Sequence, residues 1–253
     1  MFSWTAHGLD RRAGRLTLNS DYSVKIFADG ANLAEMIELY RNPLIKGFTT
    51  NPTLMRKAGV TDYEAFAKQV LAAIPDRPIS FEVFSDDFRE MERQALKIAA
   101  WGPNVSVKIP VMNTRGESCR TLICNLARSG VRLNITAVMA LEQVYELLPA
   151  LDGSQPGYIS IFAGRIADTG RDPIPLMRAA VEALASMPQI ELIWASPRQV
   201  LNVYQANEIG CHIITATSDI LKKLGLLGKD LLEYSLETVK MFRDDAMAAG
   251  FSI

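Results

Sequence analysis

The feature that most constrains the fold of this chain is a regular alternation of short β-rich runs with longer amphipathic stretches, which begins at residue 24. Runs rich in β-branched and aromatic residues predict strands, and apolar residues at a spacing of three to four predict helices. The predicted strands are 24–29, 47–51, 79–84, 105–111, 132–138, 158–166, 191–196 and 211–217. The clearest predicted helices are 62–74, 86–100, 141–148, 197–209 and 230–248.

Strands that alternate with helices are typical of βαβ units and therefore of a parallel sheet. Eight such units within residues 24–253 predict an α/β fold, a single (β/α)8 TIM-type barrel that forms one catalytic domain. Residues 1–23 are then a short N-terminal extension, and 230–248 a closing C-terminal helix. The alternative is a doubly wound open sheet. The barrel is favoured because an open sheet has fewer strands and because ADGAN, not GxGxxG, follows the first predicted strand.

Composition argues against several classes of function. The formal net charge of −1 provides no basic excess for nucleic acid or an anionic membrane. The only histidines are His7 and His212, too few for a histidine-based metal site, and the three cysteines form no CxxC pair. No apolar run approaches the roughly 18 residues of a membrane span. We therefore expect a soluble, cytoplasmic protein with no metal site.

Polar residues are unusually frequent in the C-terminal halves of the predicted strands, although a barrel interior is normally filled with branched apolar side chains. In barrel enzymes the active site lies at the C-terminal ends of the strands. The alternation of side chains along each strand would bring several of these residues together at the barrel mouth. They are Asp29, Thr50, Asn51, Glu82, Lys108, Asn134, Thr136, Ser160, Arg165, Ser196 and Arg198.

Lys108 has the greatest need of an explanation, because it interrupts the apolar strand VSVKIPV and burial of an ammonium group is costly. The strand alone leaves three interpretations open. The side chain points to solvent, forms a structural ion pair with Glu82, or takes part in chemistry. The polar residues on the neighbouring strands favour chemistry.

A desolvated lysine holds more of its free amine, which can attack a carbonyl and form an iminium. The iminium is an electron sink that permits cleavage of an adjacent C–C bond. Such chemistry needs a carboxylate to move the hydroxyl proton and a positioned water, and Asp29 and Glu82 are carboxylates at the appropriate strand ends. The other common way to promote such a C–C cleavage is a divalent metal ion that polarises the carbonyl, and the scarcity of histidine disfavours it.

A second group of residues suits an anion. Arg165 follows a glycine in FAGRI, and Ser196 and Arg198 are expected at the start of the helix that follows the seventh strand. A helix N-terminus combined with arginines is a suitable binding site for a phosphate dianion.

The ordered motifs FADGAN, GFTTNPT, FEVF, VKIP, LNITAV, FAGRI and WASPR resemble those of the transaldolase family, including its short members and the related fructose-6-phosphate aldolases. The resemblance spans roughly residues 24 to 245. It implies a cofactor-free Schiff-base mechanism in which a dihydroxyacetone unit passes from a ketose phosphate, of the sedoheptulose 7-phosphate or fructose 6-phosphate type, to an aldose phosphate.

The resemblance also implies residue roles. Lys108 matches the Schiff-base lysine, Asp29 the carboxylate that takes the proton from the donor's C4 hydroxyl, and Glu82 and Thr136 the pair that holds the catalytic water. The remaining matches are to substrate-binding positions. Asn51 and Asn134 match asparagines that bind the dihydroxyacetone hydroxyls, and Thr50 lies beside Asn51 in the sequence. Ser160 matches a serine that contacts the substrate. The phosphate site is matched by Arg165, Ser196 and Arg198.

Two positions discriminate within the family. The aldolase branch carries Gln in place of Glu82 and Tyr in place of Phe162, so both residues of this chain point to a transaldolase. Two alternatives remain: an aldolase that releases free dihydroxyacetone, and a non-catalytic barrel that binds a sugar phosphate. Because family members often self-associate, the resemblance also suggests a homo-oligomer with the C-terminal helix as an interface element.

Overall fold

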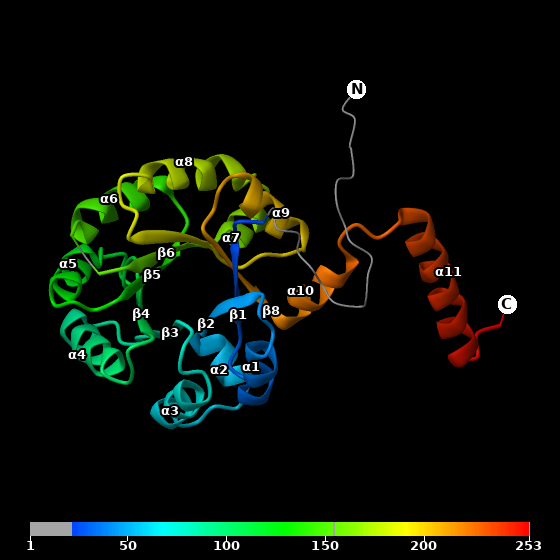
Figure 1. Cartoon of the computed structure of the whole chain (residues 1–253), viewed down its shortest axis with the longest axis horizontal. Coiled ribbons are helices and arrows are strands. Elements are labelled where there is room, and N and C mark those ends of the chain that lie inside the picture. The colour runs from blue at the N-terminus through cyan, green and yellow to red at the C-terminus, as the bar shows by residue number, and fades with distance from the viewer. Residues whose placement is uncertain (1–21, 154, 253) are drawn as a thin grey trace. The chain divides into compact units, whose positions relative to one another are not determined.

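The computed structural model describes residues 22–153 and 155–252 and confirms the predicted barrel (Figure 1). Eight parallel strands pair in chain order, and the last pairs with the first to close the sheet. The strands are β1 (Lys25–Asp29), β2 (Ile45–Thr49), β3 (Ile79–Glu82), β4 (Val105–Pro110), β5 (Leu133–Val138), β6 (Gly157–Ile161), β7 (Ile190–Trp194) and β8 (Ile213–Thr217).

Helices follow the strands and form the outer layer of the barrel (Figure 1). They are α1 (Leu33–Tyr40), α2 (Pro52–Lys57), α3 (Tyr63–Ala73), α4 (Phe88–Ala99), α5 (Arg120–Arg128), α6 (Leu141–Leu151), α7 (Ala163–Asp168), α8 (Ile174–Leu184), α9 (Leu201–Glu208) and α10 (Ser218–Lys222). Several begin at side chains that accept hydrogen bonds from the first turn, such as Asp62 before α3 and Asp87 before α4.

The chain divides into two compact units, and the barrel occupies Tyr22–Leu221. The other unit contains Lys222–Ile253, with the 3-10 helix η1 (Lys223–Leu226) and α11 (Leu231–Ala248). No side chain of α11 is buried. The predicted extension 1–23 lies almost wholly outside the described residues. No helix in the described part of the chain is long and apolar enough to cross a membrane.

Two predicted boundaries were wrong in ways that affect the site. The predicted strand 158–166 ends at Ile161, and Arg165 lies in α7, because the carbonyl of Phe162 accepts hydrogen bonds from the backbone N–H groups of Arg165 and Ile166. The predicted helix 197–209 begins only at Leu201. The side chain of Asn202 accepts hydrogen bonds from the backbone N–H groups of Arg198 and Gln199, which holds residues 197–200 outside the helix.

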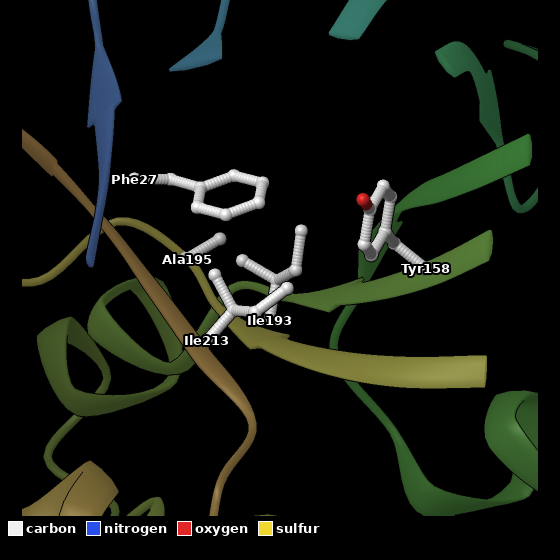
Figure 2. Close-up of a cluster of buried hydrophobic side chains, with 5 residues drawn as sticks. All are labelled: Phe27, Tyr158, Ile193, Ala195 and Ile213. Atoms are coloured by element: carbon white, nitrogen blue, oxygen red, sulfur yellow. The ribbon is translucent and has the colours of Figure 1, made fainter. Parts of the chain in front are cut away.

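The barrel interior contains an apolar cluster (Figure 2). Phe27 of β1 and Tyr158 of β6 meet edge to face with their ring centroids 5.9 Å apart, and Ile193, Ala195 and Ile213 pack beside them. Phe27 lies two residues before Asp29, so both side chains point inward and the aspartate stands nearer the C-terminal mouth. The cluster therefore forms an apolar floor below the polar residues of the mouth.

Gly47 makes room for this floor. It is the partner of Phe27 in the β1–β2 register, and a Cβ atom on Gly47 would lie 2.6 Å from Cζ of the Phe27 ring. Phe27 is only 2% exposed and is surrounded by packed neighbours, so its ring cannot move aside cheaply.

We predict that Gly47→Ala lowers the free energy of unfolding by about 1–3 kcal/mol, because the added methyl overpacks the barrel floor. Gly30→Ala is the matched control, since a Cβ at Gly30 meets no atom within 4 Å. Urea denaturation measures both variants. Phe27→Leu should restore part of the stability of Gly47→Ala, whereas equal stability of Gly47→Ala and Gly30→Ala would contradict the packing argument.

Candidate active site

Lys108 is buried at the mouth of the barrel, with an exposed fraction of 5%, so the interpretation that its side chain points to solvent is wrong. Its ammonium Nζ lies 3.1 Å from Oε2 of Glu82 and donates a hydrogen bond of 2.9 Å to the carbonyl oxygen of Thr50. Glu82 and Lys108 are partners in the β3–β4 register, which directs both side chains to the same face of the sheet. The ion pair therefore exists, and it places a carboxylate where it can exchange protons with the lysine.

Asp29, at the end of β1, accepts a hydrogen bond of 2.7 Å from the hydroxyl of Thr49. The Thr49 and Thr215 hydroxyl oxygens are 2.6 Å apart. Because the single hydroxyl hydrogen of Thr49 is given to Asp29, Thr215 donates to Thr49. A short chain of hydroxyl groups from β8 and β2 thus ends on the carboxylate.

Burial raises the pKa of the Asp29 carboxyl above its ordinary value. The positive charge of Lys108 and the hydrogen bond from Thr49 oppose this rise, and the negative charge of Glu82 adds to it. A carboxyl whose pKa is raised is a better proton acceptor near neutral pH than an exposed aspartate, which suits acid–base chemistry.

Thr136, on β5, carries a buried hydroxyl oxygen that has no hydrogen-bond partner among the described residues. Buried polar groups are normally paired, so this hydroxyl is suited to bind a water or a substrate group. Immediately after it, Ala137 has a φ of 61° and the β5–β6 register shifts between Ile135 and Val138. This irregularity lies at the barrel mouth, beside the residues of the site.

Asn134 is held by two serines. Its Nδ2 donates to the hydroxyl of Ser80 over 3.0 Å, and its Oδ1 accepts from the hydroxyl of Ser160 over 2.7 Å. All three residues are buried. The Ser160 hydroxyl is thus committed to orienting Asn134, which keeps one amide hydrogen for a ligand.

Thr50 and Asn51 connect β2 to α2. The Thr50 hydroxyl donates to the carbonyl oxygen of Ser80 over 2.8 Å and its side chain is fully buried, so Thr50 presents its main-chain carbonyl to Lys108. Asn51 is the N-cap of α2, and its Oδ1 accepts from the N–H of Leu54 over 3.0 Å. The amide nitrogen of Asn51 is left as the group that it can offer to a substrate.

The predicted anion-binding residues lie together beside α7. Nε of Arg198 donates to both carboxylate oxygens of Asp168, at 3.0 and 3.1 Å, and its Nη1 lies 3.1 Å from the Ser196 hydroxyl. Arg165 lies over the ring of Phe162, 5.4 Å from its centroid. The hydrogen bonds from Arg198 lower the pKa of the Asp168 carboxyl, so the arginine and the aspartate form a fixed charged pair.

A close approach of two backbone segments sets this geometry. A Cβ atom on Gly164 would lie 1.6 Å from the carbonyl oxygen of Ser196, so only glycine allows α7 to pack against the loop after β7. Ser196 itself has a φ of 62°, a left-handed conformation that is strained for serine. Arg198 lies in this loop, two residues before the N-cap Val200 of α9, and not within the helix itself.

Sequence reasoning missed four residues that contact the predicted site. Thr49, Ser80 and Thr215 bind Asp29, Asn134 and Thr49 respectively. Strand alternation could have shown Ser80, which lies two residues before Glu82 on the same face of β3. The fourth, Tyr63 of α3, binds the main chain of Glu82 and had no such signal in the sequence. Within the described residues, no group of three His, Cys, Asp or Glu side chains is placed to hold a metal ion.

The fold and the site define a class: a (β/α)8 barrel with a buried lysine–carboxylate pair at the C-terminal ends of its strands. The family follows from comparison with known proteins. The chain belongs to the transaldolase/fructose-6-phosphate aldolase family, whose model, described as "Transaldolase/Fructose-6-phosphate aldolase", matches residues 26–253.

Curated relatives agree with this assignment. A "Probable transaldolase" of Dehalococcoides mccartyi is 35% identical over 202 residues, which cover 79% of this chain and 90% of that protein. A "Probable transaldolase" of Thermoanaerobacter sp. is 32% identical over 231 residues, which cover 91% of this chain and all of that protein.

Solved structures of low sequence identity share the fold alone. A 2,3-dimethylmalate lyase matches with a TM-score of 0.53 and 14% identity, covering 91% of this chain and 85% of that one. KGPDC from Streptococcus mutans matches with a TM-score of 0.52 and 10% identity, covering 78% of this chain and 88% of that one.

We predict that Thr49→Val raises the pKa of Asp29, because the variant loses the hydroxyl that stabilises the carboxylate. The change is measured by pH titration of the Asp29 carboxyl carbon in NMR spectra. Thr50→Val is the matched control, since the Thr50 hydroxyl binds Ser80 and not Asp29. An unchanged or lowered Asp29 pKa in Thr49→Val would show that the Thr49 hydroxyl does not stabilise the ionised form.

Proposed function

We propose that this protein is a transaldolase that moves a dihydroxyacetone unit from a ketose phosphate to an aldose phosphate through a Schiff base on Lys108. The donor is of the sedoheptulose 7-phosphate or fructose 6-phosphate type, and the enzyme acts in the cytoplasm, in the pentose phosphate pathway. The observation that carries the proposal is the buried Lys108, 3.1 Å from the Glu82 carboxylate and accompanied by Asp29.

The first step joins the donor to the enzyme. Lys108 passes a proton to Glu82 or to water, and its free amine attacks the C2 carbonyl of the ketose. The resulting carbinolamine loses water to give the iminium. Glu82 can supply the proton for this loss, because its carboxyl group lies beside the lysine nitrogen.

The second step breaks the C3–C4 bond. Asp29 takes the proton of the C4 hydroxyl, the bond electrons move into the iminium, and an aldose phosphate leaves. The three-carbon enamine stays on Lys108. It then attacks the aldehyde carbon of the acceptor, and Asp29 returns the proton to the new hydroxyl. Asn134 and Asn51 each have amide hydrogens suited to hold the hydroxyls of this three-carbon unit.

The last step needs water. A water bound between the Glu82 carboxylate and the unpartnered Thr136 hydroxyl would attack the iminium carbon and release the product. Thr136 supports this role because its oxygen is buried and free for such a contact.

The phosphate end of the sugar fits the group formed by Arg165, Ser196 and Arg198. Two guanidinium groups and a hydroxyl suit a phosphate oxyanion. Asp168 offsets one of the positive charges by an ion pair with Arg198, 2.5 Å from Nη2 to the carboxylate. Binding of the anion is therefore expected to depend most on Arg165, which lies over Phe162 with no carboxylate hydrogen bond among the described contacts.

The second candidate function is an aldolase that releases free dihydroxyacetone. Release requires a proton to reach the enamine carbon. Phe162 packs against the apolar floor and has no hydroxyl that can deliver a proton, so the enamine is preserved for an acceptor aldehyde. This residue favours the transaldolase over the aldolase. The catalytic set around Lys108 argues in turn against a barrel that only binds sugar phosphates.

We predict that the protein, given fructose 6-phosphate and an aldose phosphate acceptor, forms a new ketose phosphate. Without acceptor, free dihydroxyacetone appears at less than about a tenth of that rate, because Phe162 offers no hydroxyl to protonate the enamine carbon. Chromatography of the products checks both rates, and Lys108→Ala should abolish the transfer. Release of dihydroxyacetone at the full rate without acceptor would instead identify an aldolase.

We also propose that the chain forms a homo-oligomer. Six large apolar side chains of α11 are more than half exposed, and self-association would remove them from water. They are Leu231, Leu232, Leu236, Val239, Phe242 and Met247.

Size-exclusion chromatography with light scattering should therefore give a mass that is a multiple of the chain mass. Val239→Glu combined with Phe242→Glu should reduce this mass, because the two carboxylates would be desolvated in an interface. Glu233→Gln in the same helix is the control, and it removes a charge without adding one. A monomeric mass for the unaltered protein at micromolar concentration would refute self-association.

A further inference from the structure

We infer that Tyr63 is a positioning residue. It binds the main chain of Glu82 and thereby positions the Glu82 carboxylate beside Lys108. The inference deepens the proposed function and rests on it for its kinetic consequences. Its structural basis is a gap in the sheet between β2 and β3 that the tyrosine hydroxyl fills.

The gap arises because β2 ends before β3 does. The β2–β3 register contains only two pairs, Phe48 with Ile79 and Thr49 with Ser80. The last backbone hydrogen bond runs from the N–H of Thr50 to the carbonyl of Ser80, over 3.1 Å. Asn51 then caps α2 and leaves the sheet. Glu82, two residues after Ser80, directs its N–H and carbonyl to the same side and meets no strand there.

Tyr63 satisfies both groups. Its hydroxyl oxygen accepts a hydrogen bond from the N–H of Glu82 over 2.8 Å, and the same hydroxyl donates to the carbonyl oxygen of Glu82, also over 2.8 Å. One side-chain atom thus replaces the two backbone partners that a longer β2 would supply. Without it, a donor and an acceptor of a strand residue in the active site would lack partners.

On its other side Glu82 is held by β4. It is paired in register with Lys108, and the N–H of Val83 donates to the carbonyl of Lys108 over 3.1 Å. The Glu82 backbone is therefore fixed between Tyr63 and the strand that carries the lysine. This backbone position lets the carboxylate reach to 3.1 Å from the lysine nitrogen.

Tyr63 is itself held rigidly. Asp62 caps the start of α3 directly before it, and its ring contacts Phe81, Phe84 and Trp101 with centroid distances of 6.3, 5.5 and 5.7 Å. Burial raises the pKa of the Tyr63 hydroxyl, so the group stays protonated and can act as donor and acceptor together. The aromatic packing fixes where the hydroxyl lies, and the hydroxyl fixes Glu82.

Tyr63→Phe removes the hydroxyl and keeps the ring. It leaves the N–H and carbonyl of Glu82 unpaired, so this stretch of β3 relaxes toward water and the carboxylate moves. A displacement of about 1 Å at a catalytic group can reduce a rate by about 100-fold. Because Glu82 serves the water-dependent steps and not the binding of the donor, the loss should fall on kcat and not on KM.

We therefore predict that Tyr63→Phe lowers kcat by about 10- to 100-fold and changes the donor KM by less than about threefold. Trp101→Phe is the matched control. Trp101 belongs to the same aromatic cluster, and its indole nitrogen has no hydrogen-bond partner in the part of the chain that the structure describes. This variant therefore loses packing but no contact with Glu82. It should lower the Tm and leave kcat near the original value, because Phe81, Phe84 and the helix cap at Asp62 still hold the Tyr63 ring in place. A Tyr63→Phe enzyme with unchanged kcat, or equal losses of kcat in the two variants, would overturn the inference.

A double-mutant cycle tests whether Tyr63 acts through Glu82. In a Glu82→Gln background, Tyr63→Phe should reduce kcat further by less than about threefold, because the group that it positions is already altered. Full additivity of the two losses would show that Tyr63 acts by another route.

A readout that does not depend on activity separates this inference from the proposed function. The NMR resonance of the Glu82 carboxyl carbon should shift in Tyr63→Phe and remain in place in Trp101→Phe. If the unaltered protein transfers no dihydroxyacetone unit, the proposed function fails while this shift still supports the positioning role. A Glu82 resonance that does not move in Tyr63→Phe refutes the positioning role, whatever the activity.

Discussion

The arrangement of this protein depends on the pairing of a buried ammonium with a carboxylate inside a barrel. Removal of the Lys108 charge from water is costly, and the cost is offset by Glu82 at 3.1 Å and by the Thr50 carbonyl at 2.9 Å. The apolar floor, which includes Phe27 and Tyr158, fills the barrel interior below this pair. Side chains from almost every strand form hydrogen bonds around the pair. These hydrogen bonds fix the geometry of the mouth.

Much of the fold could be predicted because hydrophobic periodicity reports directly on strands and helices. The sequence predicts all eight strands, and the errors in the predicted boundaries have a physical cause. A predicted strand ran on through Arg165 because FAGRI is apolar enough for either structure, and the turn into α7 depends on a tertiary contact, the packing of Gly164 against Ser196. Likewise, the late start of α9 depends on the Asn202 side chain, which local propensity does not reveal.

The candidate site could be predicted in part because side chains alternate between the two faces of a strand. Lys108 and Glu82 were placed together from strand alternation alone, and the structure brings them into contact. Alternation cannot show which polar group binds which: it does not reveal that the Ser160 hydroxyl donates to Asn134. Tyr63 lay beyond such reasoning, because a helical residue reaches the sheet only through the curvature of the barrel and the early end of β2.

The central claim is that Lys108 carries the substrate as an iminium. Borohydride reduction in the presence of fructose 6-phosphate, followed by peptide mass mapping, tests it most directly. We expect a reduced three-carbon or six-carbon adduct on the peptide that contains Lys108, and none in Lys108→Ala. Turnover that leaves this peptide unmodified, or an adduct on a different lysine, would contradict the claim.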